Sequence, residues 1–494
     1  MDTVSNTLFS LVPAFLRPTW IGPKRSLVLG LICGFSLSLS LTSLAGWASE
    51  RWKLRWSTRP LESRDIEVHG EHVVAGVEGL IGNTPLIRIN SLSDALGVEI
   101  LGKCEYLNPF GSVKDRVSLR IIQRAEDEGL IAPGDTGATI FEGTSGSTGI
   151  SIAGIARARG YRAHIVVPDD VAHEKIHMLE VLGATVEKVR PVSIVDKRHY
   201  VNLARLRAHE AHLAGAGGGV FADQFENLAN FDAHATSTAP EIWAQTAGFV
   251  DAFVSGAGTG GTIAGVGTTL KRLSNGRCQV VLGDPEGSGL YYWVREGVMW
   301  SEREEEGKRR RFQVDTIVEG IGLNRITQNL KRAVPILDDA YRVTDREALS
   351  MSRHLAAHDG LFLGSSSAVN LVTCVRLAQR WNRDRHADAL GVSGTRPLQV
   401  VTILCDSGAR HTSKFWNEDY LVKHGIEYPE NLDWLLKTPS DPSPPHVDAP
   451  SPIPEPRSSR PTTTTEGVDH GEVNLARASD PDYASSAPND LPAL

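Results

Sequence analysis

The chain has 494 residues, more than one ordinary domain needs, and its formal net charge of −8 does not suggest a nucleic acid as a partner. Its five cysteines contain no C-x-x-C pair and no Cys/His cluster. This spacing argues against a disulfide framework and against a structural zinc site, and it fits a reducing compartment. We therefore expect neither a metal ion nor a nucleic acid among the partners of the chain.

An uncharged stretch near the N-terminus, residues 26–47, is long enough to cross the hydrocarbon core of a bilayer. We interpret it as a single transmembrane anchor between a leader (1–25) and a linker (48–74). A slight excess of basic residues on its C-terminal side predicts that the main body faces the cytosol. A cleaved signal peptide is the alternative, because small residues offer cleavage sites, and a buried core helix is a weaker one.

The stretch NPFGSVKDR (Asn108–Arg116) places Lys114 in the first turn of a predicted helix. Asn-Pro and a glycine mark a turn, and apolar residues then recur among charged ones over residues 112–130. By itself this pattern favours an ordinary solvated lysine. A functional role for Lys114 therefore requires evidence from other parts of the sequence.

The body of the chain alternates short apolar runs with amphipathic segments. Strands are predicted at residues 164–168, 185–189, 252–258, 279–285 and 399–406, and helices at 173–184, 346–360 and 367–381. Alternation of this kind implies parallel sheets covered by helices. We therefore predict an α/β protein with two α/β domains within residues 75–437 and a site between them.

Three turns rich in glycine, serine and threonine connect predicted strands to predicted helices, at residues 142–160, 255–266 and 360–370. The first contains Thr144–Thr148, whose hydroxyl and N–H groups precede a helix and could hold a carboxylate or a phosphate. The second contains Gly258–Thr262, a compact group of backbone donors. Neither turn matches a P-loop or G-x-G-x-x-G. A phosphate site, a carboxylate site and the Lys114 amine together describe a site for pyridoxal phosphate bound as a Schiff base.

Residues 438–494 differ in character from the body, being rich in proline and poor in periodic apolar residues. Such a segment cannot bury enough apolar surface to offset the entropy of ordering it. We predict a disordered tail without a catalytic role.

Several motifs occur in the order found in the cysteine synthase family, which is also called the O-acetylserine sulfhydrylase family and is similar to cystathionine β-synthase. The chain resembles this family over roughly residues 75–425. The motifs are IGNTPLIRI (81–89), KCEYLNPFGSVKDR (103–116), EGTSGSTGI (142–150), ADQFENLAN (222–230), TAPEIW (238–243), GTGGT (258–262), EGIG (319–322), SSS (365–367) and LCDSGARH (404–411).

The resemblance implies a fold type II (tryptophan synthase β-like) pyridoxal-phosphate enzyme, usually a homodimer, with the cofactor between a smaller domain (about 92–230) and a larger one (about 75–91 and 231–437). Lys114 aligns with the Schiff-base lysine of the family, and Ser366 aligns with the residue that meets the pyridine nitrogen. The phosphate loop corresponds to Gly258, Thr259, Gly260, Gly261 and Thr262. The groups that hold the substrate carboxylate correspond to Thr144, Ser145, Gly146, Thr148 and Gln224.

One position departs from the family pattern. Members usually have TSGNTG, whose asparagine contacts the ring oxygen of the cofactor, and here that position is Ser147. The shorter side chain can still donate one hydrogen bond. Ser366 is a neutral hydroxyl, which would not keep the pyridine nitrogen protonated as a carboxylate would. It therefore favours β-replacement or β-elimination over transamination.

The resemblance thus implies a cysteine synthase that replaces the acetate of O-acetylserine by sulfide. Cystathionine β-synthase or serine/threonine dehydratase activity is the alternative within this chemistry. A weakly active, membrane-tethered homologue with a binding role is the alternative outside it. The GSTG and LFLGSSSAVN variants and the anchor look most like the fungal mitochondrial branch of the family. This implies an outer-membrane protein of mitochondria, with its catalytic region in the cytosol.

Overall fold

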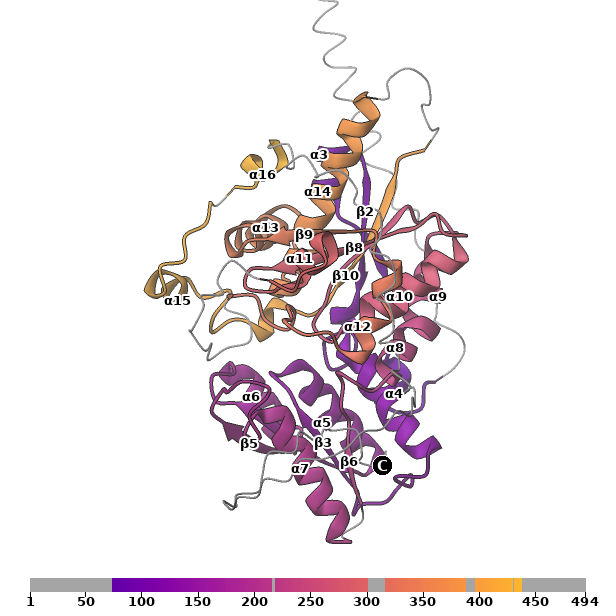
Figure 1. Cartoon of the computed structure of the whole chain (residues 1–494), viewed down its shortest axis with the longest axis vertical. Coiled ribbons are helices and arrows are strands. Elements are labelled where there is room, and N and C mark those ends of the chain that lie inside the picture. The colour runs from indigo at the N-terminus through magenta and orange to yellow at the C-terminus, as the bar shows by residue number, and fades with distance from the viewer. Residues whose placement is uncertain (1–72, 216–217, 301–315, 388–395, 430, 438–494) are drawn as a thin grey trace, which may run out of the picture. The chain divides into compact units, whose positions relative to one another are not determined.

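The alternating strands and helices of the body build two sheets in the computed structural model, which describes residues 73–215, 218–300, 316–387, 396–429 and 431–437 (Figure 1). The described residues from Val74 to Lys437 belong to one compact unit. The predicted leader and anchor, almost all of the linker, and the predicted tail lie outside the described residues. Among the residues that the structure describes, no helix is both long and apolar enough to cross a membrane.

The smaller sheet has four parallel strands in the order β5-β4-β3-β6. They are β3 (Thr139–Gly143), β4 (Arg162–Pro168), β5 (Thr185–Val189) and β6 (Gly219–Phe221). The helices that accompany this sheet are α4 (Lys114–Asp127), α5 (Ser147–Arg159), α6 (His173–Val181) and α7 (Tyr200–Leu213). Isoleucines of α4, α5, β3 and β4 form one buried core between the helices and the sheet.

The larger sheet has six strands in the order β1-β2-β10-β7-β8-β9, of which only the β1–β2 pair is antiparallel. The strands are β1 (Leu86–Arg88), β2 (Glu99–Cys104), β7 (Ala252–Gly256), β8 (Gln279–Pro285), β9 (Asp339–Val343) and β10 (Gln399–Leu404).

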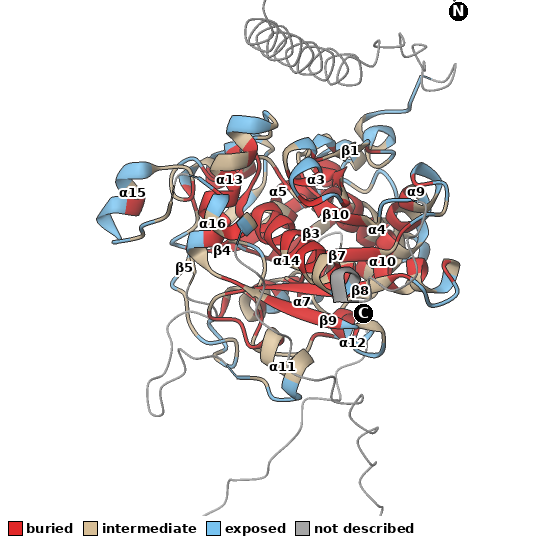
Figure 2. Ribbon diagram, turned by 90° about the horizontal axis from the view of Figure 1, so that it is seen from above, coloured by how far each residue is buried: buried red, intermediate tan, exposed pale blue. Residues whose placement is uncertain are grey.

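Helices cover both faces of the larger sheet, and successive residues of its strands therefore enter different cores. In β8, Val281 packs with residues of α13 (Asp345–His358) and α14 (Ser365–Ala387), whereas Val280 and Leu282 pack with α10 (Gly261–Leu273). Figure 2 shows α14 and the inner strands largely as buried. Burial on both faces explains why the strands are continuous apolar runs rather than alternating ones.

Shorter helices complete the described fold. They are α3 (Asn90–Leu96), α8 (Ala229–Ala233), α9 (Ala239–Gln245), α11 (Leu290–Glu296), α12 (Gln328–Lys331), α15 (Glu418–Lys423) and α16 (Asp433–Lys437). A π-helical turn at His234–Thr238 joins α8 to α9. In the described part of the chain, Cys104, Cys278, Cys374 and Cys405 are free thiols.

The α/β prediction is confirmed, and all five predicted strands are present, although two of them end earlier than expected. The prediction of a strand at the start of residues 360–370 is wrong. That segment is the short connection between α13 and α14, and its pairing is a single bridge between Leu363 and Ser407. The strand β2 lies within the range predicted for the smaller domain but pairs in parallel with β10 of the larger sheet.

Candidate active site

A cavity of about 320 Å³ is lined by residues that belong to both sheets and to their connections. The predicted residues among its lining are Lys114, Thr144, Ser145, Ser147, Thr148, Gln224, Gly258 and Thr259. A smaller adjoining cavity shares Lys114, Ser147, Gly258 and Thr259 and adds Gly260, Thr262 and Ser366. Residues that are far apart in the sequence are thus brought together at one place, as expected of a site between two α/β units.

Lys114 begins helix α4, and the end of β10 fixes its backbone. The Val113 N–H donates to the Cys405 carbonyl at 2.9 Å, and Ser112 forms a bridge with Asp406. The Lys114 side chain reaches both cavities, yet protein atoms surround it. Burial lowers the pKa of Lys114, although Cys405 and Asp406 oppose the shift. A lowered pKa favours the neutral amine, which is the form that reacts with a carbonyl and accepts a proton.

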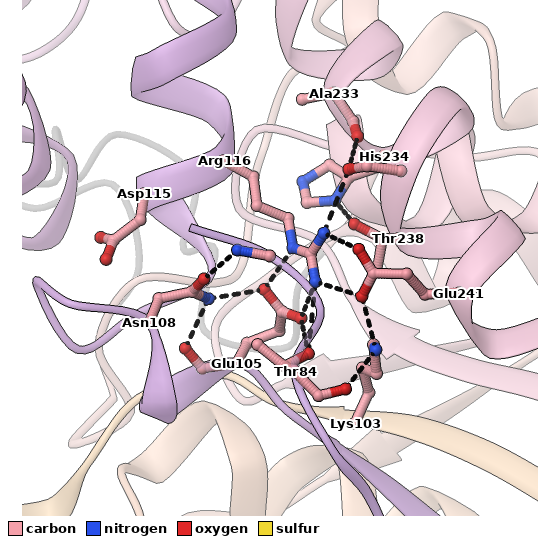
Figure 3. A network of polar contacts seen from close by, with 12 residues as sticks. Thr84, Lys103, Glu105, Asn108, Asp115, Arg116, Ala233, His234, Thr238 and Glu241 are labelled. Atoms are coloured by element: carbon pink, nitrogen blue, oxygen red, sulfur yellow. Dashed lines mark hydrogen bonds and ion pairs between the residues drawn. The ribbon is translucent and has the colours of Figure 1, made fainter. Parts of the chain in front are cut away.

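Two residues beyond Lys114, Arg116 anchors the same helical turn in a buried ionic network (Figure 3). Its guanidinium contacts the two oxygens of Glu105 at 2.8 and 2.9 Å and the two oxygens of Glu241 at 2.6 and 2.7 Å. Lys103 donates to Glu241 at 2.6 Å. Burial works against ionisation of Glu241, but Arg116 and Lys103 outweigh it and lower the pKa of Glu241 to about 2. Because β2, η4 (Glu105–Leu107), α4 and α9 all contribute, the network fixes the start of α4 against the larger sheet.

The glycine loop between β7 and α10 is so closely packed that side chains would not fit. A Cβ atom on Gly258 would lie 2.1 Å from the Gly320 carbonyl oxygen, and one on Gly261 would lie 2.0 Å from Asn230 Oδ1. Gly260 has a φ of 87°, in the left-handed region. Since α10 begins at Gly261 and runs to Leu273, its N-terminal N–H groups face the loop. This arrangement fits a phosphate group.

The three serines at the start of α14 make different contacts. The Ser365 hydroxyl accepts from the Glu319 N–H at 3.0 Å, and the Ser367 hydroxyl accepts from the Cys405 N–H at 2.8 Å. These two bonds hold the helix start against two neighbouring segments, and Ser366 is left lining the cavity beside Lys114. Of the three serines, the middle one therefore lines the cavity, while the hydroxyls of the outer two accept main-chain hydrogen bonds.

The turn after β3 presents its predicted residues in different ways. Thr148 is buried at the cavity wall, Ser145 is exposed, and Gly146 packs against the side chain of Lys175. Gln224, which follows β6, is buried at the same wall. The Thr148 hydroxyl donates to Gln224 Oε1 at 2.6 Å. At the position that departs from the family pattern, the Ser147 hydroxyl accepts from Arg410 Nη1 at 3.1 Å.

A line of charged residues forms another part of the cavity wall, and sequence reasoning assigned none of them. Lys175 of α6 pairs with Glu319, whose carboxylate lies 3.3 Å from His411 Nδ1, and His411 Nε2 lies 3.0 Å from Asp406. Burial alone would lower the pKa of His411, but Asp406 and Glu319 outweigh it and raise that pKa. The charges therefore alternate in sign from Lys175, on α6 beside the smaller sheet, to Asp406, after β10 of the larger sheet.

Comparisons with known proteins identify the protein family to which the chain belongs. Residues 77–390 match the family model described as pyridoxal-phosphate dependent enzyme. The chain is 52% identical to cysteine synthase 2 of Schizosaccharomyces pombe over 74% of this chain and 90% of that protein. It is 56% identical to cysteine synthase 2 of Neurospora crassa over 69% of this chain and 73% of that protein. The chain belongs to the cysteine synthase family of pyridoxal-phosphate dependent enzymes.

This membership confirms the resemblance noted in the motifs and the fold class. A crystal structure of O-ureido-L-serine synthase superposes with a TM-score of 0.56 and 29% identity, over 71% of this chain and 100% of that one. A Saccharomyces cerevisiae relative, 51% identical over 80% of this chain and 95% of its own length, is named "Putative mitochondrial cysteine synthase". As a family member the chain uses pyridoxal phosphate, and the amine and the glycine loop described above fit that cofactor.

Proposed function

We propose that the chain is a cysteine synthase, which converts O-acetyl-L-serine and sulfide into L-cysteine and acetate. The observation that carries the proposal is the cavity that joins the Lys114 amine, the glycine loop and Ser366, in a chain that is 52–56% identical to proteins named cysteine synthase 2. Pyridoxal phosphate, when bound, supplies an acceptor for the electrons that a substrate carbon leaves behind when it loses a proton.

The residues then have the following roles. Residues Gly258–Thr262 hold the phosphate, Lys114 holds the cofactor covalently until the substrate arrives, and Ser366 meets the pyridine nitrogen. The substrate carboxylate is held by Thr144, Ser145, Gly146, Thr148 and Gln224, of which all but Gly146 line the larger cavity. Ser147 stands at the ring oxygen, and its contact with Arg410 supports that placement because the guanidinium orients the hydroxyl. Each of the two sheets would form the core of one of the two predicted domains.

Lys114 moves the proton in the reaction. Its neutral amine takes the α-proton of the substrate, and acetate leaves the β-carbon with the bonding electron pair. Hydrosulfide then adds to the β-carbon, and Lys114 returns its proton to the α-carbon. The atoms balance without a further acid, because acetate is a good leaving group and HS⁻ already carries the proton of the product thiol.

An absorption titration of the full chain with its cofactor tests this proposal. O-acetylserine should change the visible band, and sulfide should restore it as cysteine forms. A band that ignores O-acetylserine but responds to serine with homocysteine would support cystathionine β-synthase activity instead. Bound cofactor without sulfide-dependent turnover would support a binding role, and absence of a visible band would contradict the enzyme.

Ser366→Ala should retain the cofactor but lower kcat by about tenfold, because one hydrogen bond to the cofactor ring is lost. Turnover and the position of the visible band are the measurements. Ser193→Ala, which removes an exposed hydroxyl, serves as the control and should leave both unchanged. A Ser366→Ala enzyme with full turnover and an unchanged band would remove Ser366 from the site.

We further propose that the chain is mitochondrial and that residues 26–47 anchor it in the outer membrane, with the catalytic region in the cytosol and paired with a second copy. The name of the yeast relative supports the organelle, and the uncharged stretch with basic flanks supports the anchor. Carbonate extraction of mitochondria should leave the full chain in the membrane pellet, whereas a chain without residues 1–47 should be released. Release of both chains would refute the anchor.

A further inference from the structure

Glu142, the penultimate residue of β3, is a fully buried carboxyl group behind the cavity wall. It is not among the residues that line either cavity described above. Both of its oxygens accept from Gln224: the main-chain N–H lies 3.4 Å from Oε2, and the side-chain Nε2 lies 3.1 Å from Oε1. In the described part of the chain, Gln224 is the one residue whose side chain is hydrogen-bonded to this carboxyl group, and Gln224 lines the larger cavity.

Gln224 makes hydrogen bonds through both its main chain and its side chain. Its main-chain carbonyl accepts from Asn230 at 2.8 Å and from Asn329 at 3.2 Å, and its side-chain Oε1 accepts from the Thr148 hydroxyl at 2.6 Å. A half-turn of the terminal amide would exchange its oxygen and nitrogen without moving any other atom. Hydrogen bonds connect Glu142 to Gln224 and Gln224 to Thr148, and the half-turn would reverse the direction of both.

The two orientations of the amide have opposite consequences at the cavity. When Glu142 only accepts, the amide nitrogen faces it, the amide oxygen takes the proton of Thr148, and the threonine presents a lone pair to a ligand. When Glu142 carries a proton and donates, the amide turns, and its nitrogen donates to Thr148. The threonine hydroxyl is then free to donate to a ligand, and a carboxylate binds donors, not lone pairs.

We propose that Glu142 is a positioning residue, which sets the direction of the hydrogen bonds through Gln224 and so decides whether Thr148 can donate to the substrate carboxylate. This inference rests on the proposed function, because it assigns Thr148 and Gln224 to the carboxylate of an amino-acid substrate.

The surroundings of Glu142 bring the pKa of its carboxyl group close to neutral pH. Burial raises the pKa of Glu142 to about 8, and the negative charge of Asp223, after β6, adds to the shift. Tyr200, at the start of α7, also faces it, and Arg205 of α7 lies 3.5 Å from Asp223. A raised pKa means that Glu142 is protonated below about pH 8 and ionised above it. Carboxylate binding should therefore be strong at neutral pH and weaken as the pH rises through this value.

Calorimetric titration of the full-length holoenzyme with propionate tests the inference, because the probe has a carboxylate and no other group that titrates in this range. The dissociation constant for wild type should rise about tenfold between about pH 6.5 and pH 9.5, the effect of one charge-assisted hydrogen bond. Glu142→Gln keeps the shape but cannot ionise, so this rise should disappear. Thr148→Val should bind propionate at all pH values as weakly as wild type does at high pH, and Thr148→Ser should restore the wild-type profile.

An equal pH dependence in wild type and Glu142→Gln would overturn the inference, as would a wild-type enzyme that does not bind propionate. The readout is independent of turnover. A wild-type enzyme that binds propionate with the expected pH dependence but makes no cysteine would contradict the proposed function and leave the role of Glu142 supported.

Discussion

Replacement of Lys114 by alanine should abolish covalent attachment of the cofactor and lower kcat by roughly 10³-fold or more, since it removes both the point of attachment and the general base. Attachment is measured as cofactor retained on the chain after borohydride reduction, and kcat as sulfide-dependent cysteine formation. The expected loss is large because Lys114 is held at the start of α4, and burial favours its neutral form.

Lys331→Ala is the matched control, because it removes an exposed lysine of α12 and should change neither quantity. Reducible attachment that survives in Lys114→Ala would show that another lysine carries the cofactor. Lys175 lines the same cavity and would be the next to test.

Arg116→Met should destabilise the fold by about 3–5 kcal/mol, because it leaves the buried Glu105 carboxylate without its cation. Methionine nearly preserves the volume, so the loss should come from charge rather than from a cavity. Glu105 is fully buried, and its other contacts are hydrogen bonds from Thr84 at 2.7 Å and from Asn108 at 2.9 Å, neither of which can neutralise it. The measurement is the free energy of unfolding in urea at neutral pH.

The same helix offers a control for this experiment. Arg124 pairs with Glu128 one turn later, but the two side chains are 38% and 51% exposed. Arg124→Met should therefore cost about 0.5 kcal/mol or less. If both substitutions cost the same, the buried network would not be what fixes the start of α4.

The sequence predicted the strands of this fold well because their apolar runs are continuous. Val280, Val281 and Leu282 are buried against different faces of the larger sheet, so no polar residue interrupts the run. The expected strand near Leu363 failed for a related reason. Leu363 is buried in the same core as residues of α13 and α14, so its apolar character reflects burial, and its backbone forms only the single bridge to Ser407.

The residues proposed to contact a ligand could be read from motifs in the sequence, but the contacts that hold those residues in place could not. Glu142 and Arg410 both lie within motifs that were recognised, yet their partners are 82 and 263 residues away. Contacts between residues so far apart in the sequence arise because parallel strands are joined by long crossover connections, and no local sequence pattern predicts them. The charged wall of Lys175, Glu319 and His411 was missed for the same reason.

The most direct test of the proposed function is to count products. The full chain, with its cofactor, is given O-acetylserine and sulfide, and acetate and cysteine are measured together over time. The proposed function predicts equal amounts of the two products and little acetate release without sulfide. Acetate released with pyruvate in place of cysteine, or no acetate release in an enzyme that holds its cofactor, would contradict it.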